Sequence, residues 1–284
     1  DQFALITAPN IQSIQFLRSA SMSKNSKRQS PFLGFGNPVL SDAAQMRGSR
    51  GAKNGGQKSY RNLFSQQQSR SGAMIADVKQ LKNMASLPGT AKELTAMWEA
   101  FGQPKNSLFL DAKATETEIR STTLSADIIA FATHGLMASE IGSIGEPGLV
   151  LTPPANATSD NDGYLSMSEV AALKMDTDWV ILSACNTAAG DGSETASGLS
   201  GLARSFFFAG ARKLLASNWP VRDDVSALLT VNTIKIAREN PQLSQAQAFQ
   251  RAMREIRNDE SADSDTDSWA HPNAWAPFIL IGDR

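Results

Sequence analysis

Two short apolar runs constrain the fold of this chain more than any other feature of its sequence. Residues 127–132 (DIIAFA) and 178–184 (DWVILSA) are apolar at most positions. Each run has the length of a buried β-strand, and neither approaches the roughly 18 apolar residues that a membrane-spanning helix requires. We therefore expect two central strands of a soluble protein.

Strand and helix patterns alternate along the rest of the chain. This alternation predicts an α/β fold in which helices flank a mainly parallel central sheet. In such a sheet, functional sites lie in the loops that follow the carboxyl ends of the strands. Beyond the two central runs, the sequence predicts strands at 3–8, 32–36, 107–111, 213–217 and 275–281, a hairpin from 148–152 to 163–165, and helices at 9–19, 90–101, 116–121, 166–173, 197–210, 222–239 and 244–257.

Composition excludes several classes of function. The 284 residues include 27 Lys or Arg and 28 Asp or Glu, so no overall charge attracts nucleic acid or an anionic membrane. One cysteine and two histidines exclude an internal disulfide and leave too few ligands for a zinc module. We expect a single domain over residues 1–284 with no metal, no cofactor, no nucleic acid and no membrane segment. The chain starts at Asp1 without a visible signal peptide, which indicates a piece of a longer, cytoplasmic polypeptide.

Charge is segregated within the chain. Residues 21–70 carry nine Lys or Arg and one acid, Asp42, and 47–70 are rich in Gly, Ser and Gln. We expect 21–70 to be largely a flexible surface insertion. A sharper interpretation makes it a regulatory or self-cleaved segment, because exposed chain is the preferred target of proteases. Residues 258–268 carry five acids with no base between them and predict an acidic, solvated loop.

Each central strand is followed directly by a side chain with useful chemistry. His134 and Gly135 follow the strand at 127–133, and Cys185, the only cysteine, follows 178–184. If the two strands are parallel neighbours, the imidazole and the thiol project into one crevice. A nearby imidazole accepts the thiol proton or holds the thiolate as an ion pair. The backbone N–H groups of Gly135 and Cys185 are natural donors to the oxyanion that forms during attack on an amide.

Ordinary structural roles compete with this interpretation. A single cysteine is commonly a small buried hydrophobe, and a histidine at a strand end is commonly a hydrogen-bonded structural residue. The chain also has a second imidazole, His271, which precedes Pro272 in a predicted turn and is the rival candidate for the base. A redox-sensing thiol is disfavoured because the chain contains no resolving cysteine.

Around these residues the sequence resembles the CHAT domain, a caspase-like peptidase domain that often occurs beside tetratricopeptide repeats and is related to caspases and separase. The resemblance implies a caspase-like three-layer α/β fold, with His134 as general base, Cys185 as nucleophile, and the amides of Gly135 and Cys185 as the oxyanion hole. The segment SACNT lacks the local caspase motif, so cleavage after Asp is not expected. The motifs that carry the resemblance are FATHG at 131–135, EPGLVL at 146–151, LSACNTAAGDG at 182–192, SGLSGLARSFFFAGARKLLASNWPV at 197–221 and WAPFILIG at 275–282.

The same resemblance suggests how a substrate side chain is selected. Residues 218–224 (NWPVRDD) are similar to a segment of separase-like relatives in which an Asp contacts a basic substrate residue. Asp223 is the first candidate for that role and Asp224 the second, while Asp191 is a further candidate for the pocket wall. A carboxylate in a narrow pocket favours Arg, because the guanidinium binds it with two parallel hydrogen bonds. Alternatively, Asp223 and Asp224 cap the helix predicted from residue 222.

Taken together, these patterns predict a cysteine endopeptidase that cleaves a protein or peptide substrate after a basic residue. The resemblance also implies control by a tetratricopeptide-repeat or other regulatory domain upstream. The alternative, from another class of function, is a latent or non-proteolytic caspase-like module that binds peptides or serves as a scaffold.

Overall fold

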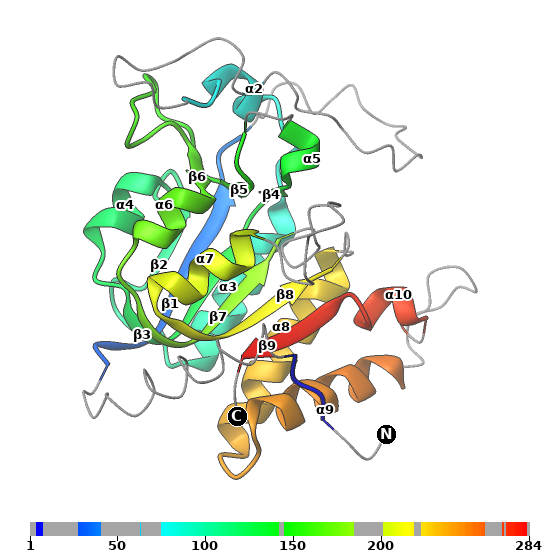
Figure 1. Ribbon diagram of the computed structural model, residues 1–284. Helices are drawn as coiled ribbons and strands as arrows, with labels where there is room; N and C mark the ends of the chain where they lie inside the picture. The colour runs from blue at the N-terminus through cyan, green and yellow to red at the C-terminus, as the bar shows by residue number, and fades with distance from the viewer. Residues whose placement is uncertain are drawn as a thin grey trace.

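The computed structural model describes a central sheet covered by helices and a smaller sheet at one end of it (Figure 1). The described residues are 4–7, 28–40, 63, 75–141, 145–184, 201–218, 223–258, 269 and 271–282. In chain order the elements are β1 (Ser30–Pro38), α2 (Val78–Lys82), α3 (Pro88–Ala100), β2 (Leu108–Asp111), α4 (Glu116–Ser121), β3 (Ser125–Ala132), β4 (Gly135–Leu136), α5 (Ala138–Ile141), β5 (Gly148–Val150), β6 (Tyr164–Ser166), α6 (Met167–Ala172), β7 (Asp176–Ser183), α7 (Gly201–Ala209), β8 (Ala211–Ser217), α8 (Asp223–Glu239), α9 (Gln245–Arg257), α10 (Pro272–Trp275) and β9 (Phe278–Gly282).

The central sheet has the strand order β2-β1-β3-β7-β8-β9. All neighbouring pairs are parallel except β8 and β9, which are antiparallel. The two apolar runs lie in β3 and β7, which are parallel neighbours in register from Ser125 and Asp176 to Ala132 and Ser183. The two strands are thus parallel neighbours, as a shared crevice at their carboxyl ends requires. The predicted mainly parallel sheet is confirmed.

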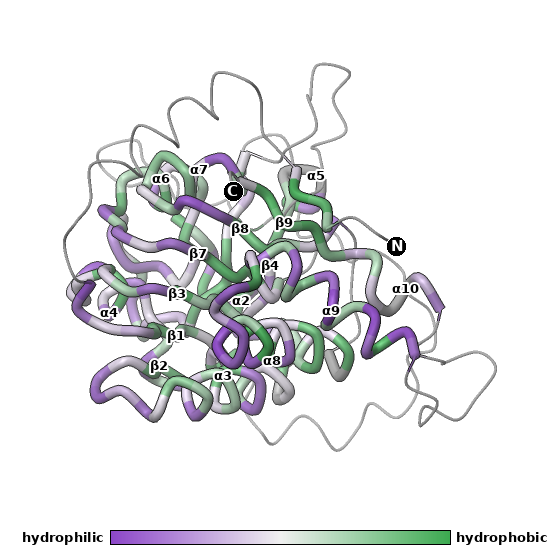
Figure 2. The backbone as a smooth tube through the Cα atoms, turned by 90° about the horizontal axis from the view of Figure 1, so that it is seen from below, coloured by the Kyte–Doolittle hydropathy of each residue, from purple (hydrophilic) through white to green (hydrophobic). Residues whose placement is uncertain are grey.

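Side chains on the central strands alternate between two cores, one on each face of the sheet. In β3, Ile129 and Phe131 belong to the core that α4, α6 and α7 cover, whereas Ile128 and Ala130 belong to the core that α3, α8 and α9 cover. Figure 1 shows α6 and α7 in front of the sheet and α3 behind it. Figure 2 colours each residue by hydropathy and shows hydrophobic residues (green) where the strands lie. The predicted three-layer α/β arrangement is thus confirmed.

A small antiparallel sheet caps the carboxyl end of the central one. It contains the predicted hairpin, now β5 and β6, and adds β4, which continues the chain beyond β3. A third core beneath this sheet includes Leu136 of β4, Tyr164 of β6, and Leu81 and Met84 at α2. This core attaches the segment that contains α2 to the end of the sheet.

Local capping signals explain where several helices begin. Ser166 before α6 and Ser244 before α9 each form a capping box, with Glu169 and Gln247 respectively. Gly210, with φ of +116°, ends α7 as the sequence predicts. The elements that the sequence did not predict are α2, α5, α10 and β4, all of five residues or fewer. Such short elements give too little periodicity to detect.

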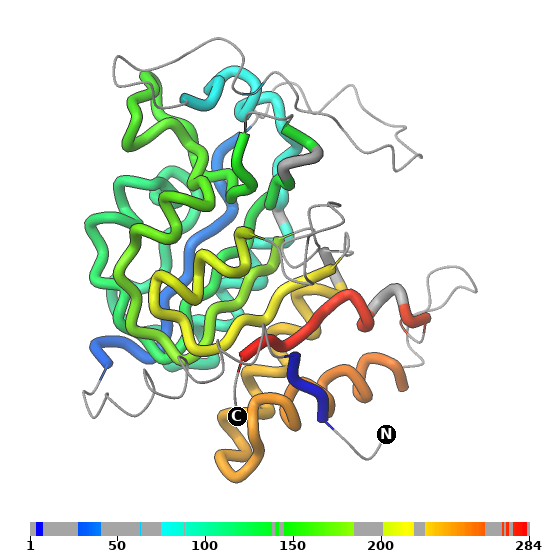
Figure 3. The backbone as a smooth tube through the Cα atoms, viewed as in Figure 1, coloured from blue at the N-terminus to red at the C-terminus, as the bar shows by residue number. Residues whose placement is uncertain are grey.

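The structure describes only parts of the two chain ends and of the basic segment at 21–70, and these parts change what was expected from the sequence. Residues 4–7, part of the strand predicted at 3–8, form one parallel bridge from Thr7 to Ile281 of β9 (Figure 3). Strand β1 interrupts the predicted insertion at 21–70, as the pattern at 32–36 indicated. The helix predicted at 9–19, residues 21–27, 41–62 and 64–70 of the insertion, and the acidic loop beyond Asn258 lie outside the described residues.

One basic residue of that segment is held against the amino end of the sheet. Arg28 forms ion pairs with Asp127 and Asp178, both at 2.8 Å. Arg212 of β8 contacts Asp176 and Asp178 at 3.1 Å and 3.3 Å. Charges thus gather at the amino ends of β3 and β7, whereas His134 follows the carboxyl end of β3.

The close approach of β1 to β3 leaves no room for a side chain at Gly36. A Cβ atom there would lie 2.2 Å from the backbone oxygen of Ala132 and 2.7 Å from Cδ1 of Leu94. Ala132 belongs to the strand that carries His134, so its carbonyl cannot move without displacing that strand. We expect Gly36→Ala to lower the free energy of unfolding by about 2–3 kcal/mol, measured by urea denaturation.

Gly34→Ala is the matched control on the same strand. Its new Cβ atom would meet only side-chain atoms, those of Phe32 and Leu108, at 2.9–3.2 Å. Because side chains can turn aside, we expect a smaller loss of stability than for Gly36→Ala. Equal losses for the two variants would contradict the role given to the Ala132 carbonyl.

Candidate active site

His134 is held in place by the backbone on either side of it. The N–H of Thr133 donates to the carbonyl of Ser183 on β7 at 3.3 Å, and the Thr133 hydroxyl donates to the carbonyl of Val150. The His134 carbonyl in turn accepts from the Val150 N–H at 2.9 Å. The chain is therefore fixed between β7 and β5 where it leaves β3, and the imidazole is half-buried.

A backbone carbonyl determines which ring nitrogen of His134 carries the proton. Nε2 lies 2.7 Å from the carbonyl oxygen of Ala85, in the connection between α2 and α3. A carbonyl oxygen can only accept a hydrogen bond, so Nε2 must be the donor. In the neutral ring, Nδ1 is then the nitrogen that can take up a proton. The geometry gives His134 the tautomer and the fixed orientation that a general base needs.

The predicted site residues differ in how far the structure describes them. Gly135 is buried beside His134, where β4 pairs it with Leu149. Cys185 and Asp191 lie outside the described residues. Asp223 and Asp224 are the first two residues of α8, which begins close to the predicted position. Their backbone is described, but their side chains are not. The rival imidazole, His271, is exposed and does not line the cavity beside His134.

A cavity of about 70 Å³ lies at the carboxyl ends of β3 and β7. His134 lines it from one strand end and Ser183 and Ala184 from the other. Ala184 is the last described residue before Cys185, and its carbonyl accepts a hydrogen bond from the Ser217 hydroxyl of β8 at 2.9 Å. The remaining lining residues are Leu87, Thr90, Glu93, Thr133, Ser217, Ser226 and Phe278.

Glu93 is a residue of this cavity that the sequence analysis missed. It lies on α3 with only 3% of its surface exposed, among Thr90, Leu94 and Met97 on the buried face of the helix. Its carboxylate accepts hydrogen bonds from Ser183 and from Thr230 of α8. The signal that could have revealed it is a carboxylate at i+3 in an i, i+4, i+7 stripe whose other members are the uncharged Thr90, Leu94 and Met97.

A second pair of buried carboxyls anchors the small sheet. Oε1 of Glu116, on α4, accepts from the backbone N–H groups of Asp162 and Gly163, each at 2.8 Å. Asp162 accepts from the N–H of Ala76 at 2.6 Å and of Tyr164 at 2.8 Å. The pair therefore ties the β5–β6 connection to the segment that leads through α2 to Ala85.

Burial makes these two carboxyls difficult to ionise. Desolvation, followed by the charge of Asp162, raises the pKa of Glu116 from 4.5 to about 8. Desolvation is also the main cause that raises the pKa of Asp162 from 3.8 to about 6. The folded protein consequently retains protons here at pH values where the unfolded chain releases them.

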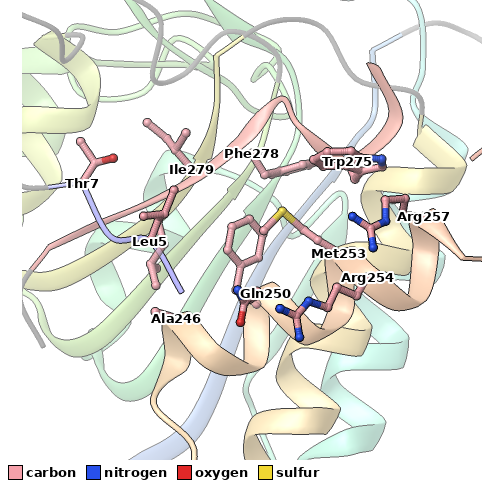
Figure 4. A pocket seen from close by; sticks show the side chains of 12 residues that line it. Leu5, Thr7, Ala246, Gln250, Met253, Arg254, Arg257, Trp275, Phe278 and Ile279 are labelled. Atoms are coloured by element: carbon pink, nitrogen blue, oxygen red, sulfur yellow. The ribbon is translucent and has the colours of Figure 1, made fainter. Parts of the chain in front are cut away.

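A separate apolar cavity of about 330 Å³ lies between α9 and β9. Figure 4 shows Arg254 and Arg257 at one end of it, near Trp275. It contains none of the predicted site residues, although Phe278 lines both cavities. Within the described part of the chain, no group of three or more His, Cys, Asp or Glu side chains is placed to hold a metal ion. No described helix is both long enough and apolar enough to cross a bilayer.

Comparisons with known proteins show which family this chain matches and which solved structures it is similar to. The CHAT domain family matches this chain over residues 1–283. Among solved structures, separase in the separase–securin complex of Saccharomyces cerevisiae is similar at 11% identity and a TM-score of 0.47, over 99% of this chain and 14% of that chain. The Arg-specific cysteine proteinase gingipain R is similar at 12% identity and a TM-score of 0.42, over 71% of this chain and 42% of that one. A search of curated proteins found no match.

The buried carboxyl pair predicts a specific dependence of stability on pH. Both pKa values are raised in the folded state. The contribution of the protonated pair to the free energy of unfolding is therefore fully present below the ordinary carboxyl pKa range, and it is lost as the pH rises through about 6 and 8. Glu116→Gln keeps an acceptor for the two N–H groups but cannot ionise. Relative to wild type, we expect this variant to gain up to about 1.4 kcal/mol per pH unit between about pH 5 and 8.

Urea denaturation at a series of pH values measures this difference. Glu118→Gln, on the same helix, removes the same charge outside the buried pair and is the matched control. We expect its stability to follow the wild-type pH profile. A Glu116→Gln profile parallel to that of wild type would contradict the assignment of raised pKa values.

Proposed function

The chain belongs to the CHAT domain family, and we propose that it is a cysteine endopeptidase that uses Cys185 as nucleophile and His134 as general base. The proposal treats residues 1–284 as one CHAT domain, in line with the family match over residues 1–283. Protein or peptide substrates, a basic residue before the cleaved bond, and control by an adjoining domain such as tetratricopeptide repeats are the finer parts of the proposal.

The orientation of His134 is the observation that carries this proposal. Its Nε2–H is bound to Ala85, so Nδ1 is the proton acceptor, and the ring lines a cavity at the end of β3. The neighbouring parallel strand β7 reaches the same cavity through Ser183, two residues before Cys185 in the sequence. A general base needs an unprotonated ring nitrogen, and the bond from Nε2 to Ala85 leaves Nδ1 as that nitrogen.

The proposed reaction has two stages and requires no cofactor. In the first, the thiol proton moves to Nδ1 of His134, and the sulfur of Cys185 attacks the amide carbon while the carbonyl oxygen takes the negative charge. The amides of Gly135 and Cys185 stabilise that oxyanion. The imidazolium gives its proton to the leaving amine as the C–N bond breaks. In the second, His134 activates a water that hydrolyses the thioester and releases the thiol.

Selection of a basic side chain rests on the start of α8. Ser226, in the first turn of this helix, lines the cavity with His134, and Asp223 is three residues before it. A carboxylate near this position binds Arg with two hydrogen bonds and Lys with fewer. Asp223 is therefore the first candidate, with Asp224 and Asp191 as the alternatives.

Digestion of a peptide library by the full-length protein tests the activity. We expect cuts after Arg or Lys, and we expect both Cys185→Ser and His134→Ala to lower kcat/KM by at least about a thousandfold, since each removes a member of one catalytic unit. His271→Ala is the matched control and should retain full activity.

An activity probe that labels reactive thiols separates the two classes of function. Labelling of wild type but not of Cys185→Ser supports the enzyme. No labelling and no cleavage, with the upstream domains and their ligands present, would contradict the proposal and favour the latent scaffold.

Replacing Asp223 by Asn tests how the substrate is selected. Asn caps a helix as well as Asp does, so the fold is kept while the charge is lost. We expect cleavage after Arg to fall by about ten- to a hundredfold, with the loss in kcat/KM for Arg substrates exceeding that for Gln substrates of the same sequence. The same substitution at Asp224 and at Asp191 identifies which carboxylate is responsible. An unchanged preference in all three variants would refute acidic recognition at these positions.

A further inference from the structure

Glu93 connects three elements through one buried carboxylate. One oxygen accepts a hydrogen bond from the Ser183 hydroxyl of β7 at 2.8 Å, and the other accepts from the Thr230 hydroxyl of α8 at 2.6 Å. The Ser183 oxygen also lies 2.9 Å from that of Ser226, so the network extends to the first turn of α8. A carboxylate with 3% exposure thus joins α3 to the end of β7 and the start of α8.

The location of this network relates it to the proposed reaction. Ser183 is two residues before Cys185 in the sequence, and Glu93 lines the same cavity as His134. Among the described residues of that cavity, Glu93 and His134 are the two ionisable ones. The start of α8 carries the positive end of a 17-residue helix dipole, and both hydroxyls lie within hydrogen-bonding distance of the carboxylate, so these contacts are favourable to a negative charge there.

Other described charges on the packed elements lie away from this cavity or are exposed. The charged residues of β3 and β7 are Asp127, Asp176 and Asp178 at the amino ends of the strands, and they pair with arginines. On α3, Lys92 and Glu99 are exposed, and on α8, Lys235 and Arg238 lie exposed in the second half of the helix. Asp223 and Asp224, at the start of α8, are the nearest other acids along that helix.

We propose that Glu93 is a positioning residue whose buried negative charge stabilises protonated His134, and with it the thiolate of Cys185, while its hydrogen bonds fix the end of β7 against α8. This inference rests on the proposed His134–Cys185 pair. A buried anion that lines the same cavity favours the imidazolium over the neutral ring, because opposite charges attract more strongly away from bulk water. Glu93 does not touch the substrate and acts through the other two residues.

The rate of alkylation by iodoacetamide as a function of pH measures this effect directly. Cys185 is the only cysteine of the chain, so the rate reports on that thiol alone and requires no substrate. We expect Glu93→Gln to move the midpoint of the profile to higher pH by about one unit. The amide has nearly the same shape, and the hydroxyls can reorient around it. Glu99→Gln, exposed on the same helix, is the matched control and should leave the midpoint unchanged.

Two further variants separate charge from structure. Thr230→Ser removes a packed methyl group but keeps the hydroxyl donor and the carboxylate, so it should lower the unfolding temperature and leave the midpoint in place. Should Glu93→Gln not fold, the double variant Glu93→Met with Thr230→Val replaces the polar pair by apolar side chains of similar size, which buried sites tolerate, and should show the same upward shift.

The outcomes distinguish failure of this inference from failure of the proposed function. If His134→Ala has the wild-type profile, no His134–Cys185 pair exists and the proposed function itself fails. If His134→Ala moves the midpoint but the charge-free Glu93 variant does not, the pair exists and the role of Glu93 is refuted. An equal shift in Thr230→Ser would likewise refute a charge effect, since packing alone would explain it.

Discussion

The parallel pairing of β3 with β7 is the interaction on which the rest of the structure depends. Its register joins residues 51 positions apart in the sequence, up to Ala132 and Ser183. Because both strands end at this level, the chain leaves each of them at the same edge of the sheet. Burial enforces this register, since a slip of one residue would move Ile129 and Phe131 out of one core and into the other. The apolar core therefore determines where the polar residues of the site lie.

The sequence predicts those elements and residues whose signals lie close together along the chain. The apolar runs identified β3 and β7, and the helical patterns at 166–173 and 244–257 identified α6 and α9, because these signals lie within a few neighbouring residues. His134 was found because it directly follows such a run. Glu93 was not, since its partners Ser183 and Thr230 are 90 and 137 residues away. The acceptor at Ala85 has no sequence signal at all, because every residue carries the same carbonyl.

The segment from Ala76 to Ala85 shows how a short element can orient the side chain of the proposed base, His134. Helix α2, at five residues, is far too short to be stable alone. It is held at one end by Asp162, which binds Ala76, and along its length by the packing of Leu81 in the third core. The Ala85 carbonyl can then accept from His134 at a fixed position. The tautomer of His134 consequently depends on packing that lies outside the cavity itself.

Two buried glutamates illustrate how surroundings assign different roles to one side chain. Glu116 is buried beside a second carboxyl, Asp162, and desolvation, followed by the charge of Asp162, raises the pKa of Glu116 to about 8, so this side chain retains its proton. Glu93 faces two hydroxyl groups and the start of α8, contacts that are favourable to a negative charge. The first pair fixes the backbone that orients His134, whereas the second residue supplies charge beside it. Geometry and electrostatics at the candidate base therefore come from separate parts of the fold, the former from the small sheet and α2 and the latter from α3 and α8.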